Sequence, residues 1–333
     1  MTQRAEASPV PVLAGAPAAT APQTAVEAAP GLLRVKPQRS LWGNAWRQFR
    51  RHRMAMIGTA VIAIIVLACF VGSALYPQPI DAQDLANTNQ PPTLQHPMGT
   101  DSLGNDMLAR ILWGGRISLA VGFVAALVAI TLGTAIGALA GFFGGFVDTV
   151  LMRVTDLFIS LPQVPLLLVV SFLYKQAFFD YFDKRFNNGI LGIFVLIVIV
   201  IGILNWMTTA RLVRAGFLSL REKEFVEAAR SIGAGQGSLM FKHILPNTMS
   251  PIIVAATLGV GAAIITESAL SFLGLGFPSD VPTWGTMLFQ ATDYFPIAPH
   301  EALIPGIMIF LTVLSINYIG DGLRDALDPR KTQ

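Results

Sequence analysis

Residues 224–247 read EFVEAARSIGAGQGSLMFKHILPN, and this polar stretch lies between two strongly apolar runs of the chain. Each flanking run is long enough to cross a bilayer, whose hydrocarbon core of about 30 Å requires roughly 20 helical residues. A multi-span membrane protein does not need a long, basic, helix-patterned loop merely to join two helices. We therefore expect this loop to contact something in the cytoplasm.

The rest of the chain is also dominated by apolar runs. Hydrophobic residues make up 53% of the 333 residues, charged residues only 13%, and the mean hydropathy is +0.59. The runs are continuous and lack the period-2 alternation of barrel strands, so they predict an all-α integral membrane protein with six transmembrane helices. Asp156, Pro162 and Pro165 interrupt the third run, which makes it the weakest. The predicted spans are residues 54–76, 117–140, 151–174, 190–210, 248–275 and 304–320.

The distribution of Lys and Arg predicts the orientation in the membrane. If the N-terminus lies inside, all but five of the 23 basic residues fall on cytoplasmic segments, and the five are Arg110, Arg116, Lys175, Lys184 and Arg185. The positive-inside rule then places both termini in the cytoplasm. The net charge of +3 reports this topology, and because the basic residues are divided among loops we expect no nucleic-acid partner.

Two segments precede the first span. Residues 1–40, rich in Ala and Pro, are expected to be a disordered cytoplasmic tail and not a secretory signal peptide. Residues 41–53 are basic and aromatic, and we interpret them as an orientation signal with aromatic anchors rather than as an amphipathic helix on the membrane surface. The membrane domain then covers residues 54–330, with a cytoplasmic loop at 211–247. Cys69 is the only cysteine, so neither an intrachain disulfide nor a cysteine zinc site is expected.

The loop itself predicts two short helices. The first has a narrow apolar face, at i, i+3, i+4 and i+7, made of Phe225, Ala228, Ala229 and Ile232. Gly233 follows this face and suits a left-handed C-cap. Ser238 is expected to N-cap a second helix over 239–244, just before Pro246. Small side chains on an exposed ridge suit a groove in another protein, and alanines are poor lipid anchors, which argues against a helix resting on lipid.

These residues resemble a known family. Glu227-Ala228-Ala229, Gly233 and Leu245-Pro246 are similar to the coupling loop of permease subunits in binding-protein-dependent ABC importers, although His243 replaces the usual isoleucine. Asn105 likewise replaces a usual arginine. The resemblance covers about residues 40–330 and points to the second (C-type) permease of dipeptide/oligopeptide (peptide/nickel) importers. The stretches that carry it are HPMGTD at 96–101, GND at 104–106, GRISL at 115–119, ESALSFLGLG at 267–276, PTWG at 282–285 and GDGLRD at 320–325.

The resemblance implies a type I ABC importer permease fold, multi-pass, in a bacterial cytoplasmic (inner) membrane. The implied partners are a homologous second permease subunit (as a heterodimer), two ABC ATPase subunits and an extracytoplasmic substrate-binding protein. ATP and Mg would bind to the ATPase subunits, because this chain has no G-x-x-x-x-G-K-[ST] loop, and we expect it to be no enzyme and to bind no metal. The implied cargo is di- or oligopeptides, with nickel complexes or glutathione as alternatives in the same family.

A coupling role is implied for Phe225, Glu227, Ala228, Ala229, Gly233, Leu245 and Pro246. Glu227 would contact the ATPase or brace the loop, and both alanines would sit in the partner's groove. ATP-driven closure of the ATPases would then move the docked helix and rotate the spans between inward-open and outward-open states.

Two further groups of residues are candidates for the transport path. Glu267, with Ser268 and Ser271, would line the path or its outer gate and attract a peptide's amino terminus. The alternative, which we favour, is that Glu267 holds helix ends by hydrogen bonding, because a charge inside a span must face the bundle interior or water. The second group lies in the outer loop and consists of His96, Asp101 and Asp106. These residues could cap the translocation path or face the binding protein, and turn chemistry in a solvated loop is an equally good explanation.

Two local pairings are also expected. Asp156 should pair with Arg153, three residues earlier on the same helix. Gly133, Gly137 and Gly141 share one helix face, and we expect static helix packing there rather than a moving contact.

The alternatives to an importer permease are an ion-coupled secondary transporter, which would show charged residues along a midplane path, and an intramembrane enzyme. Neither kind of constellation is visible in the sequence.

Overall fold

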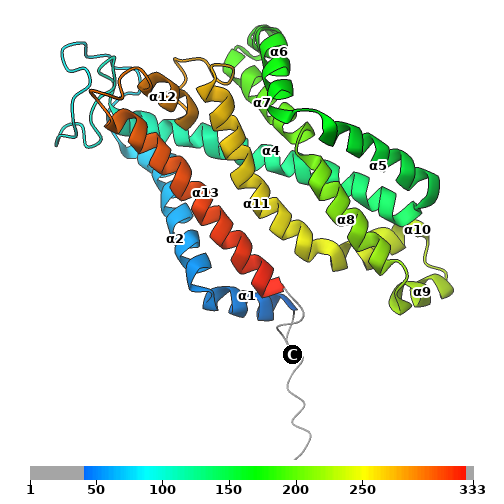
Figure 1. Ribbon diagram of the computed structural model, residues 1–333. Coiled ribbons are helices and arrows are strands. Elements are labelled where there is room, and N and C mark those ends of the chain that lie inside the picture. The colour runs from blue at the N-terminus through cyan, green and yellow to red at the C-terminus, as the bar shows by residue number, and fades with distance from the viewer. Residues whose placement is uncertain (1–40, 328–333) are drawn as a thin grey trace, which may run out of the picture. The chain divides into compact units, whose positions relative to one another are not determined.

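The structure is a computed structural model that describes residues 41–327, so the predicted tail at 1–40 lies outside the described residues. Within this range the regular elements are helices, apart from one isolated bridge between Thr100 and Asp106 (Figure 1). In chain order they are α1 Leu41–Arg51, α2 Arg53–Leu67, η1 Ala68–Gly72, α3 Ser73–Leu75, α4 Met107–Phe143, α5 Gly145–Ser160, α6 Gln163–Phe186, α7 Gly189–Ile203, α8 Trp206–Leu220, α9 Glu224–Ser231, α10 Gln236–Ser238, η2 Leu239–Ile244, α11 Leu245–Phe272, α12 Trp284–Ala291 and α13 His300–Leu327.

Several of these helices can cross a membrane. In the described part of the chain, five continuous segments are long and apolar enough, and α7 with α8, which are bent by 43° relative to each other, would make a sixth. The prediction of an all-α, multi-span protein is therefore confirmed. The five segments are Arg53–Leu75, Met107–Phe143, Gln163–Phe186, Gln236–Phe272 and His300–Leu327.

The third predicted span, 151–174, is not one helix. α5 ends at Ser160, Leu161 is extended with φ −75° and ψ 137°, and α6 starts at Gln163. Pro162 accounts for the break, because the residue before a proline is pushed out of the helical region. Pro165 lies in the first turn of α6, where a missing N–H is tolerated.

The helix that contains the second predicted span, 117–140, is longer than the span itself. α4 already begins at Met107, where the carboxylate of Asp106 caps it by accepting a hydrogen bond from the Ala109 N–H at 2.8 Å. Arg110 and Arg116, which we expected in an outer loop, are therefore helical. Their charges interrupt the apolar pattern, although Arg110 itself is only 5% exposed.

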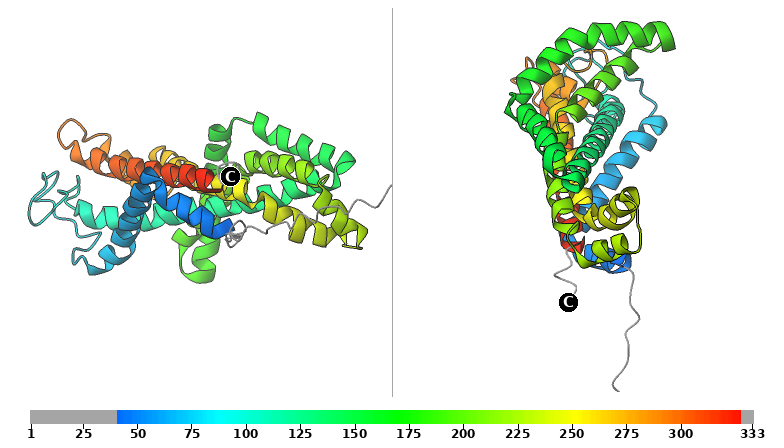
Figure 2. Two further views of the ribbon diagram at one scale, coloured as in Figure 1. Left: turned by 90° about the horizontal axis from the view of Figure 1, so that it is seen from below. Right: turned by 90° about the vertical axis from the view of Figure 1, so that its right-hand side faces the viewer.

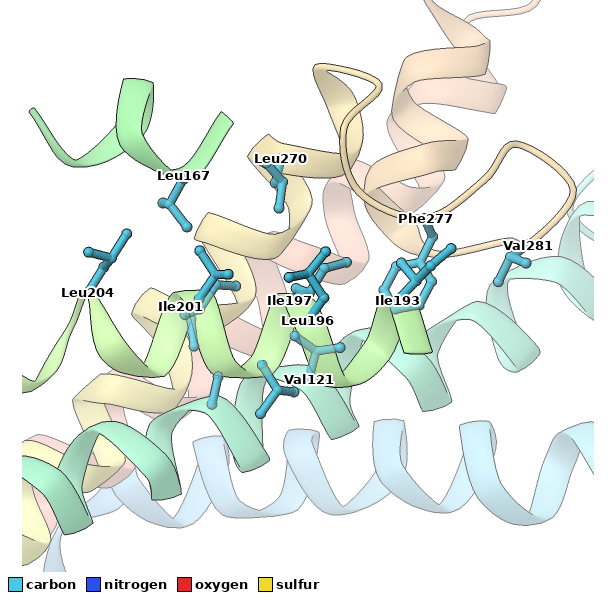
Figure 3. Close-up of a cluster of buried hydrophobic side chains, with 14 residues drawn as sticks. Val121, Leu167, Ile193, Leu196, Ile197, Ile201, Leu204, Leu270, Phe277 and Val281 are labelled. Atoms are coloured by element: carbon cyan, nitrogen blue, oxygen red, sulfur yellow. The ribbon is translucent and has the colours of Figure 1, made fainter. Parts of the chain in front are cut away.

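One buried apolar cluster centres on α7, which is apolar on every side. Its buried residues include Ile193, Ile197 and Ile201, and they meet Val121 of α4, Leu167 of α6 and Leu270 of α11 (Figure 3). At one end of the helical body lie α1 and α9, while α12 and the loop before α4 lie at the other end (Figures 1 and 2). The segment 41–53, expected as an orientation signal, forms α1, whose Ala45 and Phe49 are buried with Ala326 of α13.

Candidate functional site

The loop between α8 and α11 forms a helical bracket, which we define as residues 221–247. Its first helix, α9, starts after Lys223 and carries Glu224 and Glu227 in its first turn. Carboxylates at this position are favourable because the N-terminus of a helix carries a partial positive charge. The sequence therefore forms the first predicted loop helix.

One side of α9 attaches the bracket to the membrane helices. Val226 is fully buried and Ala229 is 5% exposed, and both belong to one apolar cluster. The other buried members of this cluster come from α4, α8, η2 and α11, and they are Ala138, Val213, Phe217, Leu239, Met240, Ile244 and Ile252. The helix thus packs mainly on η2 and shares one apolar cluster with the ends of α4, α8 and α11.

The adjacent face of α9, about a quarter turn around the helix, is bare. Phe225 is 42% exposed, Ile232 is 87% exposed, and Ala228 is exposed between them. We call these three residues the open face. Ala229 was predicted to enter a partner's groove, and this is wrong, because the protein itself covers its side chain. The apolar spacing alone could not separate the side of the helix that packs inward from the side that remains exposed.

Gly233 ends α9 as predicted. Its φ of +89° is left-handed, its N–H donates to the Arg230 carbonyl, and the Ala234 N–H donates to the Ala229 carbonyl, both at 3.0 Å. This pair of bonds is the Schellman motif, which satisfies carbonyls that a helix end otherwise leaves open. The turn therefore depends on a conformation that glycine adopts with little strain.

The second loop helix differs from the prediction. Ser238 makes no capping bond, and the helix starts at Gln236 and continues through η2 into α11 as one segment to Phe272. Pro246 stands in the first turn of α11, and its ring and missing N–H disturb the preceding turn. A π-helical turn at Leu239–Ile244 accommodates this disturbance, so the chain continues without a break. Leu245 is half-buried and Pro246 exposed.

Ion pairs connect α8 to α5. Arg214 binds both carboxylate oxygens of Asp148 in a fork, with 2.6 Å between Nη2 and Oδ2. Arg211 Nη2 lies 2.6 Å from Asp156 Oδ1. The expected pairing of Asp156 with Arg153 is therefore wrong, because a partner from another helix takes the carboxylate. Bidentate arginine contacts fix orientation as well as distance, so α5 and α8 are held as a pair.

The glycine stripe of α4 lies against α8. A Cβ atom at Gly133 would come within 2.6 Å of the Thr209 Cβ, and one at Gly141 within 2.6 Å of the Phe217 Cβ. Arg221, just after α8, donates to the Gly141 carbonyl at 3.3 Å. Close backbone approach through small residues therefore sets the packing of α4 on α8, which is the helix that leads into the bracket.

The first candidate group for the transport path, Glu267 with Ser268 and Ser271, is buried inside the protein. Glu267 is 0% exposed, and its carboxylate accepts hydrogen bonds from Ser271 Oγ at 2.9 Å and from Ser118 Oγ at 3.2 Å. Ser268 is also buried. The Ser118 hydroxyl in turn accepts from the Trp284 N–H at 3.3 Å. This network joins α4, α11 and the start of α12, which is the bracing geometry that we favoured for Glu267.

The outer-loop candidates are also turned inward. His96 Nδ1 lies 2.7 Å from Asp106 Oδ2, and the Tyr76 hydroxyl donates to the same oxygen at 3.1 Å. Partial burial, together with the Asp106 carboxylate beside it, raises the pKa of Tyr76 to about 12. Asp101 pairs with Arg110 at 3.1 Å. Asp101 and Asp106 are only 8% and 4% exposed, so neither can contact a partner in this arrangement.

A further side-chain contact joins two of the helix breaks. Gln163 Nε2 donates to the Leu204 carbonyl at 2.8 Å and to Asn205 Oδ1 at 3.1 Å, which joins the break between α5 and α6 to the break between α7 and α8. A glutamine directly after Leu161-Pro162 and an asparagine inside an apolar span were the available signs. In the range 41–327, no group of three or more His, Cys, Asp or Glu is arranged to hold a metal ion.

Apolar spans and an anchored loop helix with an open apolar face define the class of the protein, a multi-span membrane permease subunit. The chain belongs to the family of binding-protein-dependent transport system inner membrane components, whose sequence model matches residues 133–333. Residues 40–92 also match the N-terminal TM domain of oligopeptide transport permease C. It is therefore an ABC importer permease of the inner membrane and not an enzyme. This family membership excludes the two alternatives, a secondary transporter and an intramembrane enzyme.

Curated relatives agree with this family. The glutathione transport system permease protein GsiD of Escherichia coli O6:K15:H31 is 41% identical over 312 residues, covering 92% of this chain and 96% of that protein. The dipeptide transport system permease protein DppC of Alkalihalophilus pseudofirmus is 37% identical over 291 residues, covering 87% and 90%. A solved methionine ABC transporter, MetNI in an inward-facing conformation, has a TM-score of 0.49 and 19% identity, covering 65% of this chain and 94% of the matched chain.

Proposed function

We propose that this permease imports small peptides, glutathione among them, and that the open face of α9 is where a cytoplasmic ATPase subunit docks. The observation that carries the docking proposal is the contrast across α9. Val226 and Ala229 fix the helix to the spans, while Phe225, Ala228 and Ile232 remain bare. A docked partner would therefore pull on the ends of α4, α8 and α11 together.

This arrangement supports an orientation with the bracket and both termini in the cytoplasm. The basic residues Arg211, Arg214, Arg221 and Lys223 gather at the end of α8 and the start of the bracket, as the positive-inside rule requires of a cytoplasmic segment. ATP and Mg would bind to the ATPase subunits. A homologous permease would complete the membrane part, and an external binding protein would deliver the peptide.

Each bracket residue then has a distinct part in coupling. Phe225 and Ala228 would fill the partner's groove, with Ile232 at its edge. Glu227, which is exposed and lies away from both apolar sides, would orient the docked surfaces by charge. Ala229, Gly233, Leu245 and Pro246 would keep the shape of the bracket instead of contacting the partner.

The cargo proposal depends on the relatives. The two permeases named above transport glutathione and dipeptides according to their names, and glutathione is itself a small peptide with amide bonds. The shared chemistry is a short, zwitterionic chain of amides. Nickel complexes, the other alternative in the family, have no comparable support among these relatives.

A pull-down from native membranes tests the assembly. The full chain is tagged, extracted in mild detergent, and the eluate is assayed for ATPase activity and for its subunits. We expect P-loop ATPases and a second permease to co-purify. Uptake of labelled dialanine and glutathione into proteoliposomes with the matching binding protein then tests the cargo. A stable single species without ATPase would contradict the docking proposal, and an active complex that takes up neither peptide would contradict the cargo proposal.

A further inference from the structure

Two helix breaks, one between α5 and α6 and the other between α7 and α8, lie side by side. α5 and α6 are interrupted at Leu161–Pro162, and α7 and α8 at Leu204–Asn205. Gln163 joins them, since its side-chain amide donates to the Leu204 carbonyl and to Asn205 Oδ1. Irregular backbone at membrane depth is tolerated only where protein covers it or where it lines a water-filled space.

Three polar residues lie at or near these breaks and are open to the outside of the chain. Gln163 and Thr208 are exposed, and Asn205 is half-exposed. A polar side chain in hydrocarbon leaves its hydrogen-bonding groups unsatisfied, which is costly. This face of the subunit is therefore suited to water, a polar solute or a partner protein and not to lipid.

Thr208 differs from most helical threonines of this protein. Thr131, Thr257 and Thr266 each donate to the carbonyl four residues earlier, at 2.7 to 2.8 Å. The corresponding carbonyl for Thr208 is that of Leu204, which accepts from Gln163. Within residues 41–327 the Thr208 hydroxyl has no hydrogen-bond partner, so it is available to a ligand.

Two cavities meet at this point. One has a volume of about 390 Å³ and lies between the middle parts of α4, α8 and α11, where small residues such as Ala125, Gly259 and Ala262 make room. The other, of about 180 Å³, lies between the two breaks and includes Gln163 in its wall. Asn205 and Thr208 line both cavities. The larger volume falls in the range of small-molecule sites, roughly 300–1,000 Å³.

We infer that Gln163, Asn205 and Thr208 form a polar station where a passing peptide exchanges hydrogen bonds with the permease; this inference rests on the proposed peptide cargo. The residues that line the two cavities are all neutral. Amide and hydroxyl groups donate to and accept from a peptide backbone whatever its side chains are. A neutral wall also avoids a tight ion pair that would hold the peptide in place. Glu267, Ser268 and Ser271 line neither cavity.

Cysteine accessibility in the full chain tests the station. Thr208→Cys and Gln163→Cys are made in a Cys69→Ala background, because Cys69 is the only natural cysteine. Leu127→Cys and Ile203→Cys are matched controls, since both residues are exposed, lie near the middle of α4 or next to the α7–α8 break, and line neither cavity. Native membrane vesicles of both orientations react with a charged, membrane-impermeant methanethiosulfonate.

We expect the station cysteines to react at least about tenfold faster than the controls, because the thiolate forms only where water reaches the sulfur. Dialanine or S-methylglutathione, which has no free thiol to consume the reagent, should slow the reaction at Thr208→Cys by about twofold once half of the sites are occupied. Equal, slow reaction at all four positions would overturn the station. Fast reaction that neither peptide slows would overturn the peptide contact. Because the labelling needs no ATPase assay, these results are separate from the pull-down that tests the proposed function.

Discussion

The bracket and the outer loop show opposite uses of polar and apolar side chains at the two ends of one bundle. In the outer loop, Asp101 and Asp106 turn inward and are satisfied by Arg110, His96 and neighbouring backbone. In the bracket, apolar residues of the open face remain uncovered. The difference shows at which end of the bundle side chains are left without a partner. The outer loop is largely complete by itself, whereas the open face gains stability only when another protein covers it.

The largest loss of stability is expected at the buried side of α9. Ala229→Asp places a carboxylate in the apolar cluster with Leu239 and Met240, and we expect a cost of about 3–5 kcal/mol in the free energy of unfolding. Thermal unfolding in detergent can be followed by the reaction of a thiol dye with Cys69, the only cysteine, which is fully buried. An unchanged melting temperature would show that Ala229 is not covered as described.

The outer loop should lose less stability. Asp106→Ala removes the cap of α4 and the partner of His96 and Tyr76, with an expected cost of about 1.5–3 kcal/mol. Asp81→Ala is the control, because Asp81 is exposed in the same loop. Peptide uptake per folded Asp106→Ala molecule should remain normal. Normal stability combined with lost uptake would mean that Asp106 contacts a partner after all.

A substitution in the turn of the bracket should cost less stability. Gly233→Ala forces a left-handed φ of +89° on a residue with a Cβ, which costs about 1–2 kcal/mol. Gly235→Ala is a matched control two residues away, because its φ of −69° is ordinary and nothing lies within 4 Å of an added Cβ. Melting temperatures should fall for the first variant only. Equal shifts in both would remove the special role of the Schellman turn.

The smallest effect should come from a single outer-loop hydrogen bond. Tyr76→Phe removes the donor to Asp106 and leaves the ring in place, so we expect a cost of about 0.5–1.5 kcal/mol. The measurement is the same melting curve, with Asp106→Ala and the double variant completing a cycle. If the double variant lost the full sum of both single losses, the two residues would not be coupled.

The parts of the structure that depend on neighbours in sequence could be predicted from the sequence. The apolar spans, the helix at 224–231 and the left-handed Gly233 follow from local periodicity and turn chemistry. The errors concern partners distant in sequence. Asp156 is paired by Arg211, 55 residues away, and a pattern of spacing contains no information on which helices meet. Ala229 shows the same limit, since periodicity identifies an apolar side without saying what covers it.

The most direct test of the coupling account compares two changes of charge on α9. Ala228→Asp adds a negative charge to the open face, and Arg230→Gln removes a positive charge from roughly the opposite side of the helix. Both variants of the full complex are assayed for ATPase activity and peptide uptake. We predict that Ala228→Asp keeps the parent melting temperature yet loses at least about tenfold in uptake, corresponding to roughly 1.4 kcal/mol of docking energy, while Arg230→Gln stays near the parent. Normal uptake by a correctly folded Ala228→Asp complex would contradict the assignment of the open face as the docking surface.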